Sequence, residues 1–478
     1  MKQKRFLAPV RTTTRMFTMP LLVGSLCAFL AVQGGAQSAT DLVVLRGLAP
    51  VTVLSKTPEG RAALAANFTV TGAIQTGGIS QPTLLPFAQQ QQQALRDASI
   101  TNTNFAQLAD GLGTTLGTAY AARAHSIDRS TANNLSPAVA DLIAYANATT
   151  TAHSNSGKYF FSNGTRDGKV PVSAEAMEIL KERGGEAEIF GTSYGLPAGS
   201  PGAGRYGNSR PFQTEPTVVR FSGLDYFSVP TDNIAYNLGP IMNLVDSPSY
   251  PSGHTTYGFT GSVVLAVLVP ERFPEMMARA AEYRNDRILM GADYAMDVMG
   301  GRTLALYDLA HLLADDPAYV GQSLKGAPII KDFQAAVRAA RTETTTVLQT
   351  DCSNTIAVCA RKDTGRFSNP VANRAFYAAT QTYDLPVVYS KNAGTVEDVG
   401  KLAPEAGYLL TIAFPTLTLE QADQILTETE GPGGGFLDNG SSFGVYSRLN
   451  LYIAAGRATA LVSRQWAVGP GIASSTAK

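Results

Sequence analysis

The chain has 478 residues, of which 44% are hydrophobic and 16% are charged. A chain of this length and apolar content can bury a large core, which argues against an acidic disordered protein. Lys and Arg together number 38, as do Asp and Glu, and this balance argues against a basic nucleic-acid-binding protein. Five positive charges and no acid lie within residues 1–36, so the remainder carries 33 positive against 38 negative charges, a net charge of −5.

Residues 1–36 are predicted to be a secretory signal peptide. A basic start precedes the apolar stretch 16–32 and the small residues 34–36. This order is typical of a signal with cleavage near Ala36 or two to three residues later. An uncleaved membrane anchor is the alternative. We expect membrane contact only through this segment, because no other stretch approaches 18 apolar residues. We therefore expect a periplasmic or secreted protein.

Cysteine usage fits an exported protein. Loss of the signal removes Cys27 and leaves Cys352 and Cys359, which are separated by six residues. Two nearby cysteines in an oxidising compartment predict a local disulfide. Two unpaired thiols remain the alternative, whereas a metal site is disfavoured because no histidine lies nearby.

Helix signals dominate the chain in order. Ser136 is a plausible N-cap before Pro137 at the first helical position, and the run after His254 is apolar nearly all round, as in a buried helix. We expect helices over 86–110, 136–153, 173–183, the run after His254, two segments between 274 and 314, and 327–346. The pattern predicts an all-α core.

Three regions of the chain are predicted. Residues 1–36 form the signal, residues 37–346 a helical core, and residues 347–478 a C-terminal extension or cap. Within the core, residues 191–212 are rich in Gly, Pro and Ser. A long irregular stretch inside a compact domain is usually functional.

Three short segments together predict an anion site. Arg210 precedes Pro211, the sequence Pro-Ser-Gly-His occupies 251–254, and Arg287 lies further on. Two guanidiniums can bind a tetrahedral oxyanion through forked hydrogen bonds. Ser252 and Gly253 stand where a helix begins, so free backbone N–H groups would face the same anion. His254 beside them could donate a proton to a leaving oxygen.

These segments resemble the acid phosphatase and vanadium haloperoxidase superfamily, which includes type 2 phosphatidic acid phosphatases and class A bacterial acid phosphatases. The family pattern is K-x6-RP, then PSGH, then SR-x5-H-x3-D. Here 39 residues separate the first two elements and 31 separate the second from the third. The resemblance spans about residues 200–305, and residues 447–452 (SRLNLY) resemble C-terminal parts of secreted bacterial members. It implies a helical bundle of this family's type.

The resemblance also implies roles and partners. Phosphate would be bound by Arg210, Ser252, Gly253 and Arg287, and His254 would protonate the leaving group. Asp293 stands at the nucleophile position and Asp297 at that of the orienting carboxylate. The expected reaction is hydrolysis of a small phosphate monoester, without cofactor or metal and without a nucleic-acid partner.

Departures from the pattern leave alternatives open. The family's Lys position is Ala203, with Arg205 nearby, and the residue before Arg287 is Asp286 rather than Ser. Asp293 replaces the nucleophilic His, which disfavours vanadate-dependent halide oxidation and leaves a non-catalytic anion-binding descendant as the main rival. Asp293 and Asp297, four residues apart, could also be an exposed acidic pair or a metal-binding pair.

A serine esterase is a further alternative. Residues 191–195 match G-x-S-x-G, which would make Ser193 the nucleophile. The residues that follow are too rich in Gly and Pro to begin the helix that this motif requires.

Overall fold

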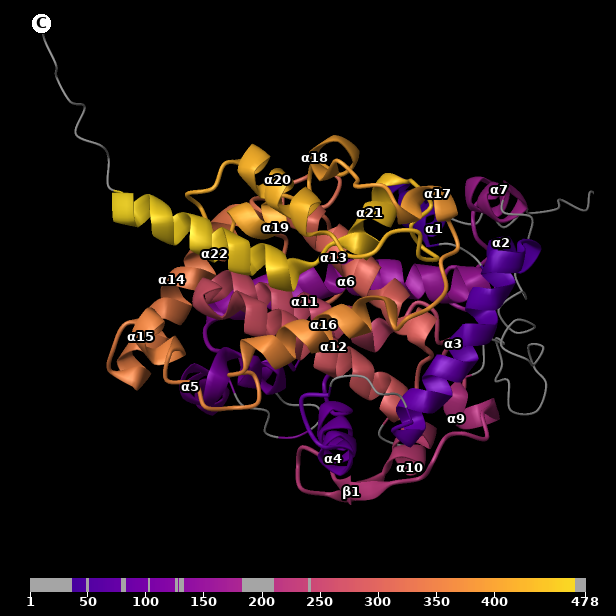
Figure 1. Cartoon of the computed structure of the whole chain (residues 1–478), viewed down its shortest axis with the longest axis horizontal. Helices are drawn as coiled ribbons and strands as arrows, with labels where there is room; N and C mark the ends of the chain where they lie inside the picture. Colours follow the sequence, from indigo (N-terminus) through magenta and orange to yellow (C-terminus); the bar gives the residue numbers. More distant parts are fainter. Residues whose placement is uncertain are drawn as a thin grey trace, which may run out of the picture.

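The computed structural model describes residues 37–48, 51–78, 83–101, 104–124, 128, 133–182, 210–239 and 242–468. Within them the predicted all-α class is confirmed, because helices make up nearly all of the regular structure (Figure 1). A two-stranded antiparallel hairpin pairs β1 (Ser222–Leu224) with β2 (Pro230–Asp232). The predicted signal 1–36, Ser193, Ala203 and Arg205 lie outside the described residues.

Helix α6 begins where its sequence signals predict. Ser136 caps α6, its side chain accepting a hydrogen bond from the Val139 N–H, and Pro137 occupies the first turn as predicted. This helix continues ten residues beyond the predicted end. The prediction over 86–110 was wrong in its middle, where α4 stops before a separate 3₁₀ helix, η1, begins. The bounds are α1 Ala39–Gly47, α2 Val51–Lys56, α3 Pro58–Thr76, α4 Phe87–Asp97, η1 Ala106–Leu112, α5 Gly113–Arg123, α6 Pro137–Asn163 and α7 Ala174–Glu182.

Helix α11 forms the centre of the fold. It spans Gly253–Leu268 and packs against α6, α12 (Phe273–Leu289), α13 (Ala295–Leu313) and α14 (Phe333–Cys352) (Figure 1). Its apolar sequence suits this position, because a helix covered on all sides needs no polar face. Only His254 and Tyr257 on this helix are partly exposed. The short elements α9 Pro211–Thr214, α10 Asn233–Leu238 and η2 Pro270–Arg272 connect the larger ones.

A close approach between α13 and the start of α11 fixes the geometry of this region. A Cβ on Gly301 would lie 2.4 Å from the Ser252 carbonyl oxygen, so only glycine lets the two helices meet there. The Ser252 N–H donates to the Asp297 carbonyl over 3.0 Å. The first turn of α11 is therefore held directly against the first turn of α13.

The C-terminal half packs on the same core. The predicted boundary at 346/347 falls inside α14, and both α16 and α22 pack against α12 (Figure 1). Buried Arg302 of α13 donates to the carbonyls of Ser447, over 2.9 Å, and Leu449. The bounds are α15 Ile356–Ala360, α16 Pro370–Thr382, α17 Ser390–Ala393, α18 Val399–Leu402, α19 Tyr408–Thr411, α20 Leu419–Thr429, α21 Ser442–Arg448 and α22 Leu451–Val468.

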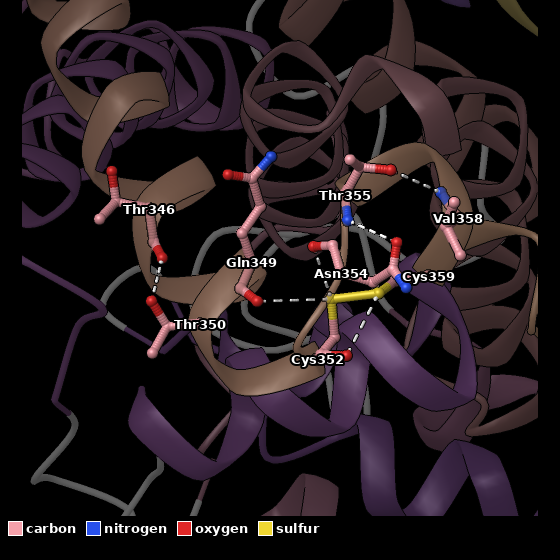
Figure 2. Close-up of a disulfide and its surroundings, with 8 residues drawn as sticks. All are labelled: Thr346, Gln349, Thr350, Cys352, Asn354, Thr355, Val358 and Cys359. Atoms are coloured by element: carbon pink, nitrogen blue, oxygen red, sulfur yellow. Dashed lines mark hydrogen bonds between the residues drawn. A yellow bond between two sulfur atoms is a disulfide. The ribbon is translucent and has the colours of Figure 1, made fainter.

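Two predictions in this half meet different outcomes. The helix expected over 327–346 begins only at Phe333, because the side chain of Asp332 caps it by accepting from the Ala335 N–H. The predicted disulfide is present between Cys352 and Cys359 (Figure 2). It joins the end of α14 to α15.

The contact between α11 and α12 gives a prediction for stability. A Cβ on Gly258 would lie 2.1 Å from the ring of buried Tyr283. Gly258→Ala should therefore lower the free energy of unfolding by about 1–3 kcal/mol, the usual cost of overpacking. Gly456→Ala is the control, because its Cβ meets nothing within 4 Å on an exposed face of α22, and it should stabilise by up to about 1 kcal/mol. Urea denaturation measures both, and an equal effect of the two variants would contradict the packing argument.

Candidate functional site

The predicted anion-binding segment lies at the N-terminus of α11. Ser252 is the N-cap, and its hydroxyl accepts from the Thr255 N–H over 3.2 Å. The expectation that the Ser252 N–H is free was wrong, since that group donates to the Asp297 carbonyl. The N–H groups of Gly253 and His254 have no partner within the described part of the chain. These two amides, with the positive end of the helix dipole, are what the helix offers an anion.

Arg210 is brought to the same place, but its donors are already in use. Its guanidinium donates to the Ser247 carbonyl (2.8 Å) and hydroxyl (3.3 Å), and to the Pro248 carbonyl (3.0 Å). It also donates to the Ala292 carbonyl (2.7 Å) and to Asp293 Oδ1 (2.9 Å). All five guanidinium N–H groups are thereby occupied. Arg210 can bind phosphate directly only if the contact to Asp293 is given up; otherwise it contributes its charge.

Arg287, at the end of α12, retains donor capacity. Its Nε lies 3.3 Å from Asp293 Oδ2, and its Nη2 contacts Met242 Sδ at 3.8 Å. Its Nη1 is buried without a partner among the described residues. A buried, unpartnered guanidinium nitrogen is costly, and an anion at this position would satisfy it.

Asp293 bridges the two arginines. Its carboxylate is buried and reaches Arg210 through Oδ1 and Arg287 through Oδ2. The alternative of an exposed acidic pair with Asp297 does not apply, because both side chains are buried. Within the described residues no group of His, Cys, Asp and Glu has an arrangement that could hold a metal ion.

Lys158 is the site residue that the sequence patterns missed. It lies on α6, is 7% exposed, and its Nζ would be 3.0 Å from a Cβ on Gly253. Burial, followed by the positive charge of Arg210, lowers the pKa of its ammonium group to about 8. No hydrogen-bond partner of this ammonium exists among the described residues. The one hint in the sequence is that Lys158 is the only lysine or arginine of α6.

His254 is poised as a neutral imidazole. Burial, and then the charges of Arg287, Lys158 and Arg210, hold its pKa well below the usual value. Tyr257, one turn further along α11, lies with its ring centroid 5.6 Å from that of the imidazole. An anion bound among the three cations would offset their effect, so His254 gains its proton most readily when the site is filled.

The two remaining acidic positions differ in location. Asp297 accepts from the Tyr294 N–H over 2.8 Å, and burial together with the charge of Asp293 raises its pKa to about 7. Asp286 faces away from the site and accepts from Gln90 Nε2 over 2.6 Å. Burial, and then Asp97 and Glu282, raise the pKa of Asp286 well above its usual value. Asp286 therefore lies outside the candidate anion site.

The chain is similar to known acid phosphatases over a short segment. The chain is 41% identical over 64 residues to a non-specific acid phosphatase of Salmonella typhimurium, covering 13% of this chain and 26% of that protein. It is 37% identical over 67 residues to an acid phosphatase of Zymomonas mobilis, covering 14% and 25%. The chain thus matches about a quarter of the length of these curated relatives. No family model matches the chain, and no solved structure matches it.

Anion affinity at this site should fall as pH rises. Asp297 gains a negative charge near its pKa of about 7, and Lys158 loses a positive charge near its pKa of about 8. Both changes act against an anion, so sulfate, which does not titrate in this range, should bind at least about tenfold more weakly at pH 9 than at pH 6. Calorimetric titration measures the sulfate affinity at each pH. In Asp297→Asn only the decrease near pH 7 should disappear. A sulfate affinity that does not change with pH would contradict the roles given to Asp297 and Lys158.

Proposed function

We propose that this chain is an exported acid phosphatase that hydrolyses small phosphate monoesters without a metal ion. The observation that carries the proposal is the meeting of three buried cations, Arg210, Arg287 and Lys158, beside His254 at the N-terminus of α11. Arg287 Nη1, Lys158 Nζ and two backbone N–H groups are available to a tetrahedral anion there. The partial identity to acid phosphatases supports the same reaction class.

The proposed reaction has two steps. An Asp293 oxygen attacks phosphorus and forms an acyl phosphate, while the ester O–P bond breaks and His254 gives its proton to the leaving oxygen. Water then attacks phosphorus, its proton passes to His254, and phosphate leaves as the Asp293 carboxylate is restored. Arg287 and Lys158 would stabilise the charge on the equatorial oxygens in both steps.

The position of Asp293 also favours a second function. A carboxylate that bridges both arginines already neutralises part of the site, and a second anion about 4 Å away meets a repulsion of roughly 4 kcal/mol at an effective dielectric of 20. A non-catalytic phosphate-binding protein, in which an anion sits beside Asp293 without being attacked, is therefore the alternative. Export rests on residues 1–36 and is part of the proposal.

The test is hydrolysis of 4-nitrophenyl phosphate at mildly acidic pH, with excess EDTA, by the chain lacking residues 1–36. Turnover together with a hydroxylamine-sensitive phosphoenzyme after rapid quenching would support Asp293 as nucleophile. Turnover that EDTA stops would contradict the metal-free reaction. An inert chain that still binds sulfate, and that gains activity in Asp293→His, would instead establish the anion-binding alternative. Hydrolysis of 4-nitrophenyl acetate that is lost in Ser193→Ala and retained in His254→Ala would indicate the serine esterase.

A further inference from the structure

A cleft apart from the anion site is lined by residues of α4, η1 and α5; the ribbons of α4 and α5 lie at the lower side of the molecule in Figure 1. Its volume is about 360 Å³, within the range of small-molecule pockets, about 300–1,000 Å³. Its walls come from α4, η1, α5, the turn after β1, and residues 365–367. We call it the Gln107 cleft, after a buried glutamine at its wall.

The side chain of Gln107 has unmet hydrogen-bonding capacity. It is 6% exposed, and neither its amide nitrogen nor its amide oxygen has a partner among the described residues. A buried carboxamide left unpaired at both ends is costly for folding. Because Gln107 lines the cleft, a ligand that both donates and accepts hydrogen bonds would satisfy both ends.

The charged side chains around the cleft balance in number, and most of them form ion pairs with one another. Both oxygens of Asp97 bind Arg279, at 2.6 Å each. Arg366 binds Asp110 (2.6 Å) and Glu282 (2.8 Å). Among the residues that line the cleft, the two arginines Arg96 and Arg366 are balanced by the two carboxylates Asp97 and Asp110. Because the positive and negative charges of the wall balance, neither an anion nor a cation is attracted to the cleft, and a neutral ligand fits it best.

The groups still open to a ligand suit hydroxyls. Asp110 is held by Arg279 and Arg366, yet its side chain is 36% exposed and each carboxylate oxygen can accept a further bond. Arg96 stands 5.4 Å from the centroid of the Tyr226 ring, and both line the cleft. A carboxylate, a carboxamide and a guanidinium beside an aromatic ring can bind neighbouring hydroxyls, which donate to one group and accept from the next.

We propose that the Gln107 cleft binds a neutral polyhydroxylated ligand of the size of a mono- or disaccharide. The hydroxyls would donate to Asp110 and to the Gln107 amide oxygen, and would accept from the Gln107 amide nitrogen and from Arg96. A zwitterionic amino acid fits less well, because Asp97 and Arg366 are already paired and leave no matched charges for it. The site is separate from the anion site, so its occupation does not depend on phosphatase activity.

The test is calorimetric titration and saturation-transfer NMR of the chain lacking residues 1–36. The probes are glucose, maltose, sucrose, lactose and trehalose, with glycine and alanine as zwitterionic comparisons. At least one sugar should bind saturably. Binding should weaken at least tenfold in Gln107→Leu and in Tyr226→Ala, and remain unchanged in Gln424→Leu, a control on the exposed face of α20.

Two further readouts separate a ligand site from a structural role. Gln107→Leu removes an unpaired buried amide, so Tm should rise while sugar binding is lost. Phosphatase activity and sulfate affinity should be unchanged in this variant. No saturable binding of any of the five sugars, or sugar binding indifferent to Gln107→Leu and Tyr226→Ala, would overturn the proposal. Binding of glycine or alanine in preference to the sugars would also overturn it.

Discussion

Asp293→Asn should abolish hydrolysis and at the same time tighten the binding of sulfate. If Asp293 is the nucleophile, its loss should lower kcat by a factor on the order of 10⁴ to 10⁶. The same change removes the negative charge that occupies Arg210 and Arg287. An incoming anion would then find both guanidiniums without a competing carboxylate, and its affinity should rise by about ten- to a hundredfold, equivalent to about 1.4–2.7 kcal/mol.

This variant is informative because its rate of hydrolysis should fall while its affinity for sulfate should rise. A variant that has merely lost its fold would lose both properties, and circular dichroism would reveal it. Asp351→Asn is the matched control and should change neither the rate nor the sulfate affinity. It breaks an ion pair with Arg123 on the solvent-exposed side of α14, far from the anion site in sequence. An Asp293→Asn variant that still hydrolyses esters at the native rate would exclude Asp293 as the nucleophile. Unchanged sulfate affinity would show that Asp293 does not compete with the anion.

His254→Ala should slow hydrolysis by a factor that depends on the leaving group. A general acid contributes about 10²–10⁴ in rate, and the full loss is expected for alkyl phosphates, whose alkoxide cannot leave without a proton. The loss should be much smaller for 4-nitrophenyl phosphate, because nitrophenolate leaves unprotonated. Since the pKa of His254 is depressed by burial and by its cationic neighbours, sulfate affinity at pH 9, where the imidazole stays neutral, should change little in His254→Ala.

Steady-state kinetics with the two esters measures this ratio directly. His311→Ala is the matched control, because His311 is paired with Asp316 at 2.7 Å and stacks on Tyr319 away from the anion site. Its kinetics should remain those of the native chain even if its stability falls. Equal losses for the alkyl and nitrophenyl esters in His254→Ala would remove His254 from the role of acid and leave it a positioning residue.

The fold class was accessible from the sequence because local signals carry it. The cap at Ser136 with Pro137 behind it, and the all-round apolar pattern after His254, depend on residues within a few positions of one another. Where the signals misled, a local capping group decided the outcome, as at Asp332, whose carboxylate starts α14 later than its composition suggests. The glycines that set helix distances could not be interpreted in this way, since what a Cβ on Gly258 or Gly301 would meet belongs to another helix or to another segment of the chain.

For the candidate site too, the sequence predicted some features and could not predict others. The resemblance to the phosphatase pattern named Arg210, His254, Arg287, Asp293 and Asp297, and the structure brings these residues together. The sequence could not reveal that Arg210 uses all five of its N–H groups on its surroundings, because these five contacts go to residues 37 to 83 positions away.

Lys158 shows most clearly what the sequence by itself left open. The sequence determined the helices, the anion-binding motif and the missing motif lysine at Ala203. Only the tertiary structure shows that Lys158 lies at the candidate site, because α6 brings it to Gly253 from 95 positions earlier in the chain. Hydrogen bonds within a turn or a cap depend on neighbours in sequence, whereas the charge balance of a buried site depends on every element packed around it.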